Sequence, residues 1–218
     1  MINEALGNKT AIKLLKELFK EPRHEFKEIE LINRAGTGKG SANNTINNLI
    51  KHKVLIEKRA GKTKLISLNI NSEIVFLLKN LFDQEKMLNM DDVKKAAIYL
   101  LRDETRKNAE LIVVFGSTIS GTYTKKSDID ILLATNNSEE INKKRVKIEE
   151  LFGERFNLHV YGKDYIINEI QKDSFIRNSF LSGVIIHGLD FGRTIFSSLG
   201  GDNNLDRLFF LEERIKSA

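Results

Sequence analysis

Two aspartates one residue apart, Asp128 and Asp130, lie in the segment IVVFGSTISGTYTKKSDIDILL at positions 112–133. If residues 127–134 form a strand, side-chain alternation directs both carboxylates to the same face. Two carboxylates at that spacing repel each other unless they are protonated or bridged by cations. Hard oxygen ligands favour Mg²⁺, which keeps several waters and also takes phosphate oxygens. The pattern therefore predicts a site for a divalent cation and a phosphate.

A tight turn precedes the acidic pair. The run LIVVF at 111–115 is continuously apolar and rich in β-branched residues, as expected of a buried strand. Gly116 allows a sharp turn after it, and the backbone N–H groups that follow can reach a phosphate. Ser117 adds a hydroxyl donor. We expect this turn and the acidic pair to form one site.

These residues resemble the DNA polymerase β-like nucleotidyltransferase superfamily, in its minimal nucleotidyltransferase branch. The matching positions are Gly116, Ser117, Gly121, Ser127, Asp128 and Asp130. The resemblance implies a mixed sheet with helices over roughly residues 93–190. It also implies that Gly116, Ser117 and Ser127 bind the nucleotide. Asp128 and Asp130 would then bind Mg²⁺ or Mn²⁺ and assist in-line attack on the α-phosphorus of an NTP, with pyrophosphate leaving.

Two departures from that family pattern affect the expected chemistry. The branch usually has an arginine where this chain has Ser120. The superfamily also carries a third carboxylate on the next central strand, which by register falls on Asn157 in RFNLHVYG at 155–162. An amide coordinates a metal weakly and cannot accept a proton. His159 lies on the same expected face, and imidazole is the side chain that most often acts as a general base, although an isolated strand histidine is often structural.

The first seventy residues predict a different kind of unit. Helical periodicity covers 8–21, 24–36 and 42–54, with Pro22 ending the first helix and Ser41 available to cap the third. A hairpin with a basic, glycine-containing tip follows over 54–70. Three short helices followed by a hairpin resemble a winged helix-turn-helix domain.

Charge and polar side chains in this unit favour a nucleic-acid partner. Residues 1–70 hold 14 Lys and Arg against 7 Asp and Glu, whereas residues 71–218 hold 21 against 23. Candidate base-reading residues on the third helix, opposite its apolar stripe, are Asn43, Asn44, Asn47 and Asn48. Candidate phosphate contacts on the hairpin are Lys58, Arg59, Lys62 and Lys64. Protein–protein contact and a simply solvated asparagine face remain alternatives.

We therefore expect an α+β chain with a winged helix-turn-helix over 1–70, a helical connector over 71–92 and a mixed-sheet nucleotidyltransferase domain with a C-terminal helix over 93–218. The first connector helix, near 72–88, carries an apolar stripe that also suits a dimer contact. That stripe consists of Ile74, Leu77, Leu78, Leu81 and Phe82. The next helix, near 92–107, is expected to turn Val93, Ala97, Leu100 and Leu101 inward.

Composition limits the setting in which the chain works. There is no cysteine, so disulfides and thiolate metal sites are excluded and a reducing cytoplasm is the natural expectation. Apolar runs are too short to cross a bilayer, and the N-terminus has no pattern typical of a secretory signal. We expect no membrane partner.

Three functional hypotheses follow from the sequence. The first is a Mg²⁺-dependent transferase that moves an NMP from an NTP to an unidentified acceptor and binds DNA through its N-terminal domain. The second is a transcription regulator whose nucleotidyltransferase fold has weak or no activity. The third is an antitoxin-like transferase that modifies a partner protein.

Overall fold

The computed structural model describes residues 8–124 and 127–199. The expected C-terminal helix over 205–218 lies outside them. The first part of the chain contains α2 (Lys9–Lys20), β1 (Phe26–Lys27), α3 (Glu28–Arg34), α4 (Lys39–Lys51), β2 (Leu55–Ala60) and β3 (Thr63–Leu68). Two helices follow, α5 (Glu73–Leu88) and α6 (Asp92–Thr105). The remaining elements are β4 (Leu111–Phe115), α7 (Ser117–Ser120), β5 (Ile129–Ala134), α8 (Ser138–Phe152), β6 (Phe156–Tyr161), α9 (Lys163–Glu169), α10 (Ser174–Ser182), β7 (Val184–His187) and α11 (Leu189–Ser198).

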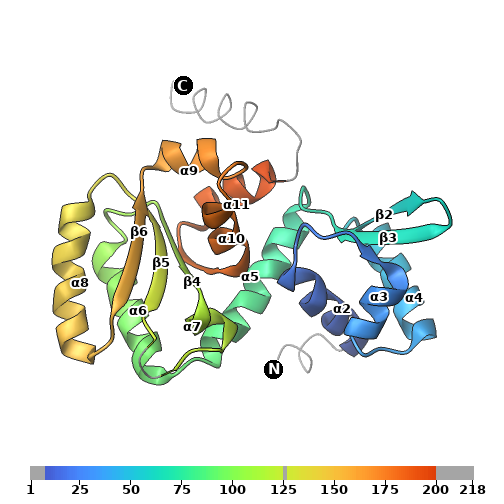
Figure 1. Cartoon of the computed structure of the whole chain (residues 1–218), viewed down its shortest axis with the longest axis horizontal. Coiled ribbons are helices and arrows are strands. Elements are labelled where there is room, and N and C mark those ends of the chain that lie inside the picture. The colour runs from blue at the N-terminus through green and yellow to red at the C-terminus, as the bar shows by residue number, and fades with distance from the viewer. Residues whose placement is uncertain (1–7, 125–126, 200–218) are drawn as a thin grey trace.

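The N-terminal elements pack three helices against a small antiparallel sheet of strand order β1-β3-β2. The three helices and the hairpin occur where the sequence predicts them, and the hairpin projects at the end of the molecule remote from the second sheet (Figure 1). The short strand β1 was not expected, because 24–27 was predicted as the start of a helix. Phe26 is fully buried and pairs with Ile66 instead. Burying that ring extends the sheet at the cost of one helical turn.

The start of α4 also differs from the prediction. The helix begins at Lys39 after Gly38, so Ser41 lies within its first turn and does not cap it. The Ser41 hydroxyl hydrogen-bonds the Thr10 hydroxyl of α2, with 2.9 Å between the two oxygens. The Ser41 side chain, which the sequence suggested as a helix cap, therefore forms a contact between α2 and α4 instead.

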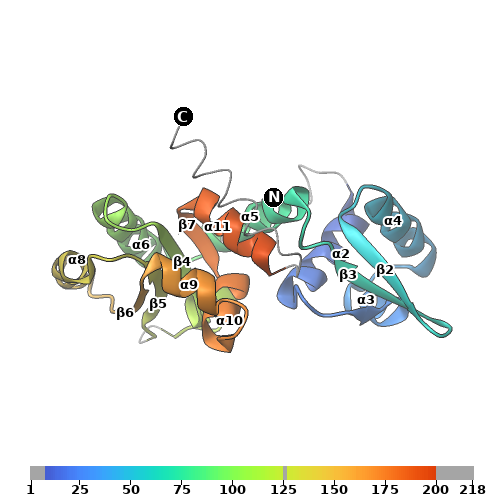
Figure 2. The same ribbon diagram turned by 90° about the horizontal axis from the view of Figure 1, so that it is seen from above.

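The second sheet is mixed, with strand order β6-β5-β4-β7. Strands β5 and β6 are parallel, and β4 is antiparallel to both β5 and β7. Helices α6 and α8 cover one face, and α9, α10 and α11 cover the other (Figure 2). Side chains of β4 and β5 are buried on both faces, which explains the near-continuous apolar runs of these central strands.

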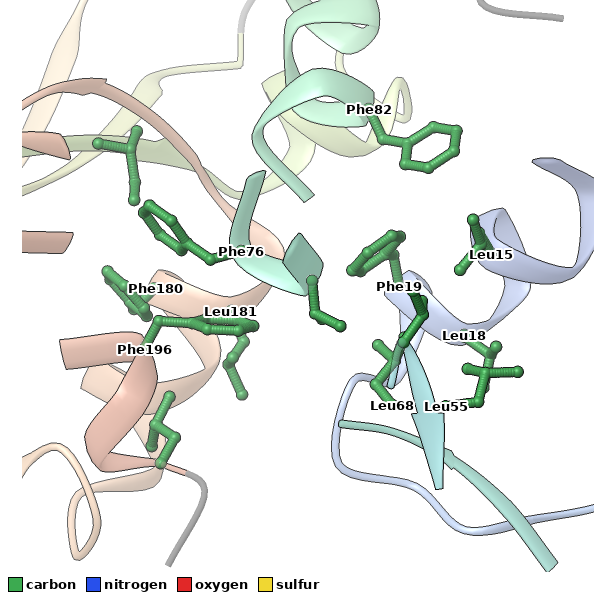
Figure 3. Packing of buried hydrophobic residues seen from close by; sticks show 14 of the residues in the cluster. Leu15, Leu18, Phe19, Leu55, Leu68, Phe76, Phe82, Phe180, Leu181 and Phe196 are labelled. Carbon is green, nitrogen blue, oxygen red and sulfur yellow. The ribbon is translucent and has the colours of Figure 1, made fainter. Parts of the chain in front are cut away.

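Helix α5 joins the two parts by packing against both. Its Phe82 ring meets Phe19 of α2, with centroids 5.5 Å apart, and its Phe76 ring meets Phe196 of α11 at 5.4 Å (Figure 3). One cluster of buried apolar side chains therefore runs from the N-terminal helices through α5 to the second sheet.

The buried face of α5 differs from the predicted one. Ile74, Leu77 and Leu81 are 50%, 53% and 42% exposed. Lys79 and Asp83 are buried in their place, and they form an ion pair with each other. The Lys79 ammonium also donates to the Gly183 carbonyl at 2.9 Å. The predicted stripe was therefore right for Phe82, which is buried, and for Leu78, which packs against the same cluster, and wrong for its other members. The dimer contact suggested for this stripe stays a prediction.

At the first turn of helix α6, too, a lysine is buried where an apolar residue was expected. Asp91 caps the helix by accepting from the backbone N–H groups of Val93 and Lys94, at 3.0 and 3.1 Å. Val93, expected inside, is 46% exposed, whereas Lys94 is 2% exposed.

No helix among residues 8–124 and 127–199 has the length and hydropathy needed to span a bilayer.

Candidate nucleotide site

The turn after β4 is shaped around Gly116. This residue has φ +75°, a conformation that L side chains rarely adopt, and it leads directly into the short helix α7. A Cβ atom on Gly116 would lie 2.2 Å from Oδ2 of Asp130. Only glycine therefore satisfies both the backbone angle and the close approach of the carboxylate, which places the Gly116–Ser117 turn against Asp130.

Asp130 lies between two partners in the sheet. It is opposite Phe115 in the antiparallel ladder with β4 and beside Asn157 in the parallel ladder with β6. The Asn157 amide Nδ2 donates a hydrogen bond to Asp130 Oδ1 at 2.9 Å. The sequence-based register, which set Asn157 beside the acidic pair, is confirmed by this pairing.

Asp128 does not belong to the strand. The expected strand 127–134 begins two residues late, at Ile129, so the bounds predicted for it were wrong. Asp128 is exposed, and its backbone carbonyl accepts a hydrogen bond from the Thr118 hydroxyl at 3.4 Å. Strand alternation therefore does not fix the direction of the Asp128 side chain, and its backbone lies only two positions along the chain from that of Asp130.

A buried lysine holds the loop before Asp128. The Lys94 ammonium donates to the Ser127 carbonyl at 2.9 Å and forms an ion pair with Glu154, just before β6. The Ser127 hydroxyl accepts from the Thr124 backbone N–H at 2.9 Å. Lys94 thus ties α6 to the starts of β5 and β6. Sequence reasoning missed it, because a lysine next to a helix cap carries no signal for a partner sixty residues away.

The geometry around His159 differs from that of a hydrogen-bonded base. Its ring lies 4.7 Å from the Phe175 ring and 5.5 Å from the Phe115 ring, centroid to centroid. Its partners in the described part of the chain are therefore aromatic. As expected, it lies on the same face of β6 as Asn157. A role as general base stays a prediction. His187, on β7, contacts the Ala109 carbonyl through Nε2 at 3.0 Å.

The described residues contain no third acid at this site. Among residues 8–124 and 127–199, no group of three or more His, Cys, Asp or Glu side chains is arranged to hold a metal ion. A cation here would have Asp128 and Asp130 as its carboxylate ligands, with Asn157 in the neighbouring position.

The candidate nucleic-acid residues are not equally available. Asn44 and Asn47 are exposed, but Asn43 is half-buried and its Oδ1 is enclosed without a hydrogen-bond partner. That burial contradicts the outward position expected for Asn43, because it lies too close to the buried side of α4. Asn47 Oδ1 accepts from the Lys64 ammonium at 3.3 Å.

The hairpin cations divide in the same way. Lys58 pairs with Glu25 at 2.5 Å and Arg59 with Glu57 at 3.2 Å. Lys64 contacts Glu57 at 3.3 Å and a second carboxylate from α3. Burial would raise the pKa of Glu57, but hydrogen bonds from Lys64 and Arg59 outweigh burial and lower it. Lys62 is exposed and takes part in no ion pair within the described residues.

Comparison with known families gives a match that covers the second sheet. Residues 98–187 match the family model of the nucleotidyltransferase domain, a segment that runs from within α6 to the end of β7. The match supports placing this segment in the nucleotidyltransferase superfamily, with a generic activity of nucleotide transfer from an NTP. No curated protein and no solved structure matches the chain.

Proposed function

We propose that this protein transfers an NMP from an NTP to an acceptor, with Asp128 and Asp130 as the ligands of a divalent cation. The observation that carries the proposal is the contact of the Gly116 turn with Asp130, inside the segment that matches the nucleotidyltransferase domain. A glycine turn next to a cation-binding carboxylate places phosphate donors and charge neutralisation at one point.

The residues present fit a magnesium or manganese ion. Both acids offer hard oxygen donors, and the absence of a Cβ on Gly116 leaves room for Oδ2 of Asp130. Oδ1 accepts one hydrogen bond from Asn157 and retains lone pairs for coordination. When bound, the cation supplies positive charge to the triphosphate.

The chain's own groups would orient the substrate. The Ser117 hydroxyl and the backbone N–H groups of Ser117 and Thr118, at the start of α7, would bind phosphate oxygens. The next two N–H groups of α7 already donate to the Gly116 carbonyl. Asn157 would hold Asp130 in one orientation, acting as a positioning residue. Because an amide cannot accept a proton, we assign deprotonation of the acceptor hydroxyl to His159.

Labelled nucleotides test the transfer. Full-length protein with α-labelled NTPs and Mg²⁺ or Mn²⁺ should label an acceptor or release pyrophosphate. Asp128→Ala and Asp130→Ala should abolish the signal while circular dichroism stays unchanged. Asp190→Ala is the matched control, because that carboxylate is 98% exposed on α11. A signal that survives both site variants would refute the proposal.

For the N-terminal part, we propose a winged helix-turn-helix that binds DNA. The arrangement of three helices with a hairpin, the excess of 14 basic over 7 acidic residues and the exposed Asn44 and Lys62 support it. Affinity for duplex DNA should then fall steeply as salt is raised, because phosphate contacts release counterions.

A second candidate function is a DNA-binding regulator that responds to nucleotide without turnover. Asn157 favours it, since it replaces the carboxylate that the superfamily pattern places there and binds Asp130 instead. Under this alternative, an NTP with Mg²⁺ shifts DNA affinity of the full-length protein while no pyrophosphate appears. Transfer to a partner protein is the remaining hypothesis for the acceptor, and a labelled protein band in the first assay would identify it.

A further inference from the structure

Three aromatic rings from distant parts of the chain meet beside the candidate site. Phe115 ends β4, His159 lies in β6 and Phe175 lies in the first turn of α10. The Phe115 and Phe175 rings are 5.7 Å apart and nearly perpendicular, and the His159 ring lies within 5.5 Å of both. Such spacings are those of favourable aromatic pairs. We refer to these three residues as the aromatic cluster.

The cluster shares a sheet face with the acidic site. Phe115 is directly opposite Asp130 in the antiparallel ladder, so their side chains lie on the same face. His159 is two residues beyond Asn157 on β6, which keeps it on that face about 7 Å further along the strand. The first ring of the cluster, that of Phe115, is therefore on the strand next to Asp130, the carboxylate proposed to hold the cation.

One ring of the cluster is left uncovered. Phe115 is 8% exposed, whereas Phe175 is 40% exposed although Ile176 and Phe180 of the same helix are buried. Phe175 therefore contributes little to the core. It presents an apolar ring to solvent, and the two other rings fix its position from behind.

We propose that Phe175, supported by His159 and Phe115, stacks against the base of the bound nucleotide. This inference rests on the proposed function, because it assumes that the triphosphate lies at Asp128, Asp130 and the Gly116 turn. An aromatic face can stack on any base, so the contact adds affinity for all four nucleotides, with only a modest preference for purines because of their larger ring system.

A comparison of two ligands isolates the base. Titration calorimetry with Mg²⁺ is done for full-length protein with ATP and with inorganic tripolyphosphate, which has no base. Phe175→Ala should weaken ATP binding about 5-fold to 100-fold and leave tripolyphosphate binding unchanged. Tyr99→Ala is the matched control, because Tyr99 stacks on Arg102 of α6, which covers the opposite face of the sheet, and should change neither affinity.

The outcomes separate this inference from the proposed function. If Phe175→Ala leaves ATP affinity unchanged, or weakens both ligands equally, stacking is refuted. If wild-type protein binds neither ligand, the nucleotide site itself fails. If wild-type protein binds ATP and tripolyphosphate with equal affinity and Asp130→Ala weakens the binding of both, the nucleotide site is supported and base stacking is refuted.

A fluorescent variant gives an independent measurement that does not remove the ring. The chain has no tryptophan, so Phe175→Trp introduces a single indole at the cluster. ATP should quench its emission and tripolyphosphate should not. Quenching by both ligands to the same extent, or by neither, would contradict stacking even if Phe175→Ala fails to fold.

Discussion

Oδ2 of Asp130 lies 2.2 Å from the position that a Cβ atom on Gly116 would occupy. The carboxylate and the turn therefore fit together only while position 116 has no side chain. This relationship joins the end of β4 to the start of β5 at the point where we place the phosphates.

Gly116→Ala should disrupt nucleotide binding. The added methyl group displaces the Asp130 carboxylate, and a non-glycine residue at φ +75° adds about 1–3 kcal/mol of strain. Calorimetry with an NTP and Mg²⁺ measures the first effect, and denaturant unfolding measures the second. Gly121→Ala is the control, since Gly121 has the same φ with nothing within 4 Å of its Cβ position. Gly121 has ψ 13°, whereas Gly116 has ψ −154°, so alanine is less strained at 121. An equal loss of nucleotide affinity in both variants would contradict a specific effect of the clash with Asp130.

Asn157→Asp should strengthen the cation site. It replaces the amide donor with a third carboxylate next to Asp130, so repulsion should lower the Tm without metal. Adding Mn²⁺ should raise the Tm more than in the wild type, with metal affinity increased roughly tenfold. Asn168→Asp adds the same charge on exposed α9 and should not respond to Mn²⁺. No metal-dependent difference between these variants would contradict a cation at Asp130.

Lys94→Met should loosen the loop before Asp128. It leaves the Glu154 carboxylate without its cation and the Ser127 carbonyl without its donor, and breaking a buried pair costs about 3–5 kcal/mol. Lys95→Met, on the partly exposed neighbour, should cost much less. Urea unfolding compares the two. Adding Glu154→Gln to Lys94→Met should recover part of the loss, and no recovery would argue against the ion pair.

Some residues in and around the candidate site were predicted from the sequence and others were not. The spacing of Gly116, Ser117 and Asp130 indicated that the turn and the acid lie together, and strand register placed Asn157 beside Asp130, because both signals are local or repeat along a strand. Lys94 and Phe175 were missed. Their roles depend on contacts with Glu154 and His159, which are distant in the sequence and leave no periodic pattern.

Helix α5 illustrates the opposite error. Its bounds were close to those predicted, but periodicity assigned its buried face by hydropathy and therefore chose Leu77 and Leu81. The folded protein buries Lys79 because the Gly183 carbonyl, 104 residues further on, and Asp83 both meet its ammonium. Nothing near Lys79 in the sequence indicates that acceptor.

Burial gives Lys79 a distinct pH signature. Desolvation lowers its pKa below the ordinary value, against the opposing attraction of Asp83. The folded state then releases this proton at lower pH than the unfolded chain, so stability rises with pH between the lowered pKa and about 10.4. Urea unfolding over a series of pH values up to about 10.4 should show the stability of the wild type rising relative to that of Lys79→Met. Lys86→Met, on a more exposed lysine that meets the same carboxylate, should keep most of the wild-type slope, because repulsion from Lys86 is the smallest cause of the lowered pKa of Lys79.

Lys62→Ala and Lys64→Ala should affect DNA binding differently. Lys62 is exposed and free to meet a phosphate, so its loss should weaken binding and reduce the salt slope by about 1. Lys64 is already paired with Glu28 and Glu57, so its loss should alter stability more than the slope. Fluorescence anisotropy over a salt series measures both. Identical slopes for the two variants would contradict a phosphate contact at Lys62.

The shared helix α5 couples the two halves of the described chain. Phe19 and Phe196 pack against the same helix, so the two halves are joined by a packed helix and not by a flexible linker. A duplex bound to the hairpin, as proposed, would therefore be held in a fixed orientation relative to the candidate nucleotide site. A mutation that unfolds either half would expose the apolar side chains of α5 and destabilise the other half.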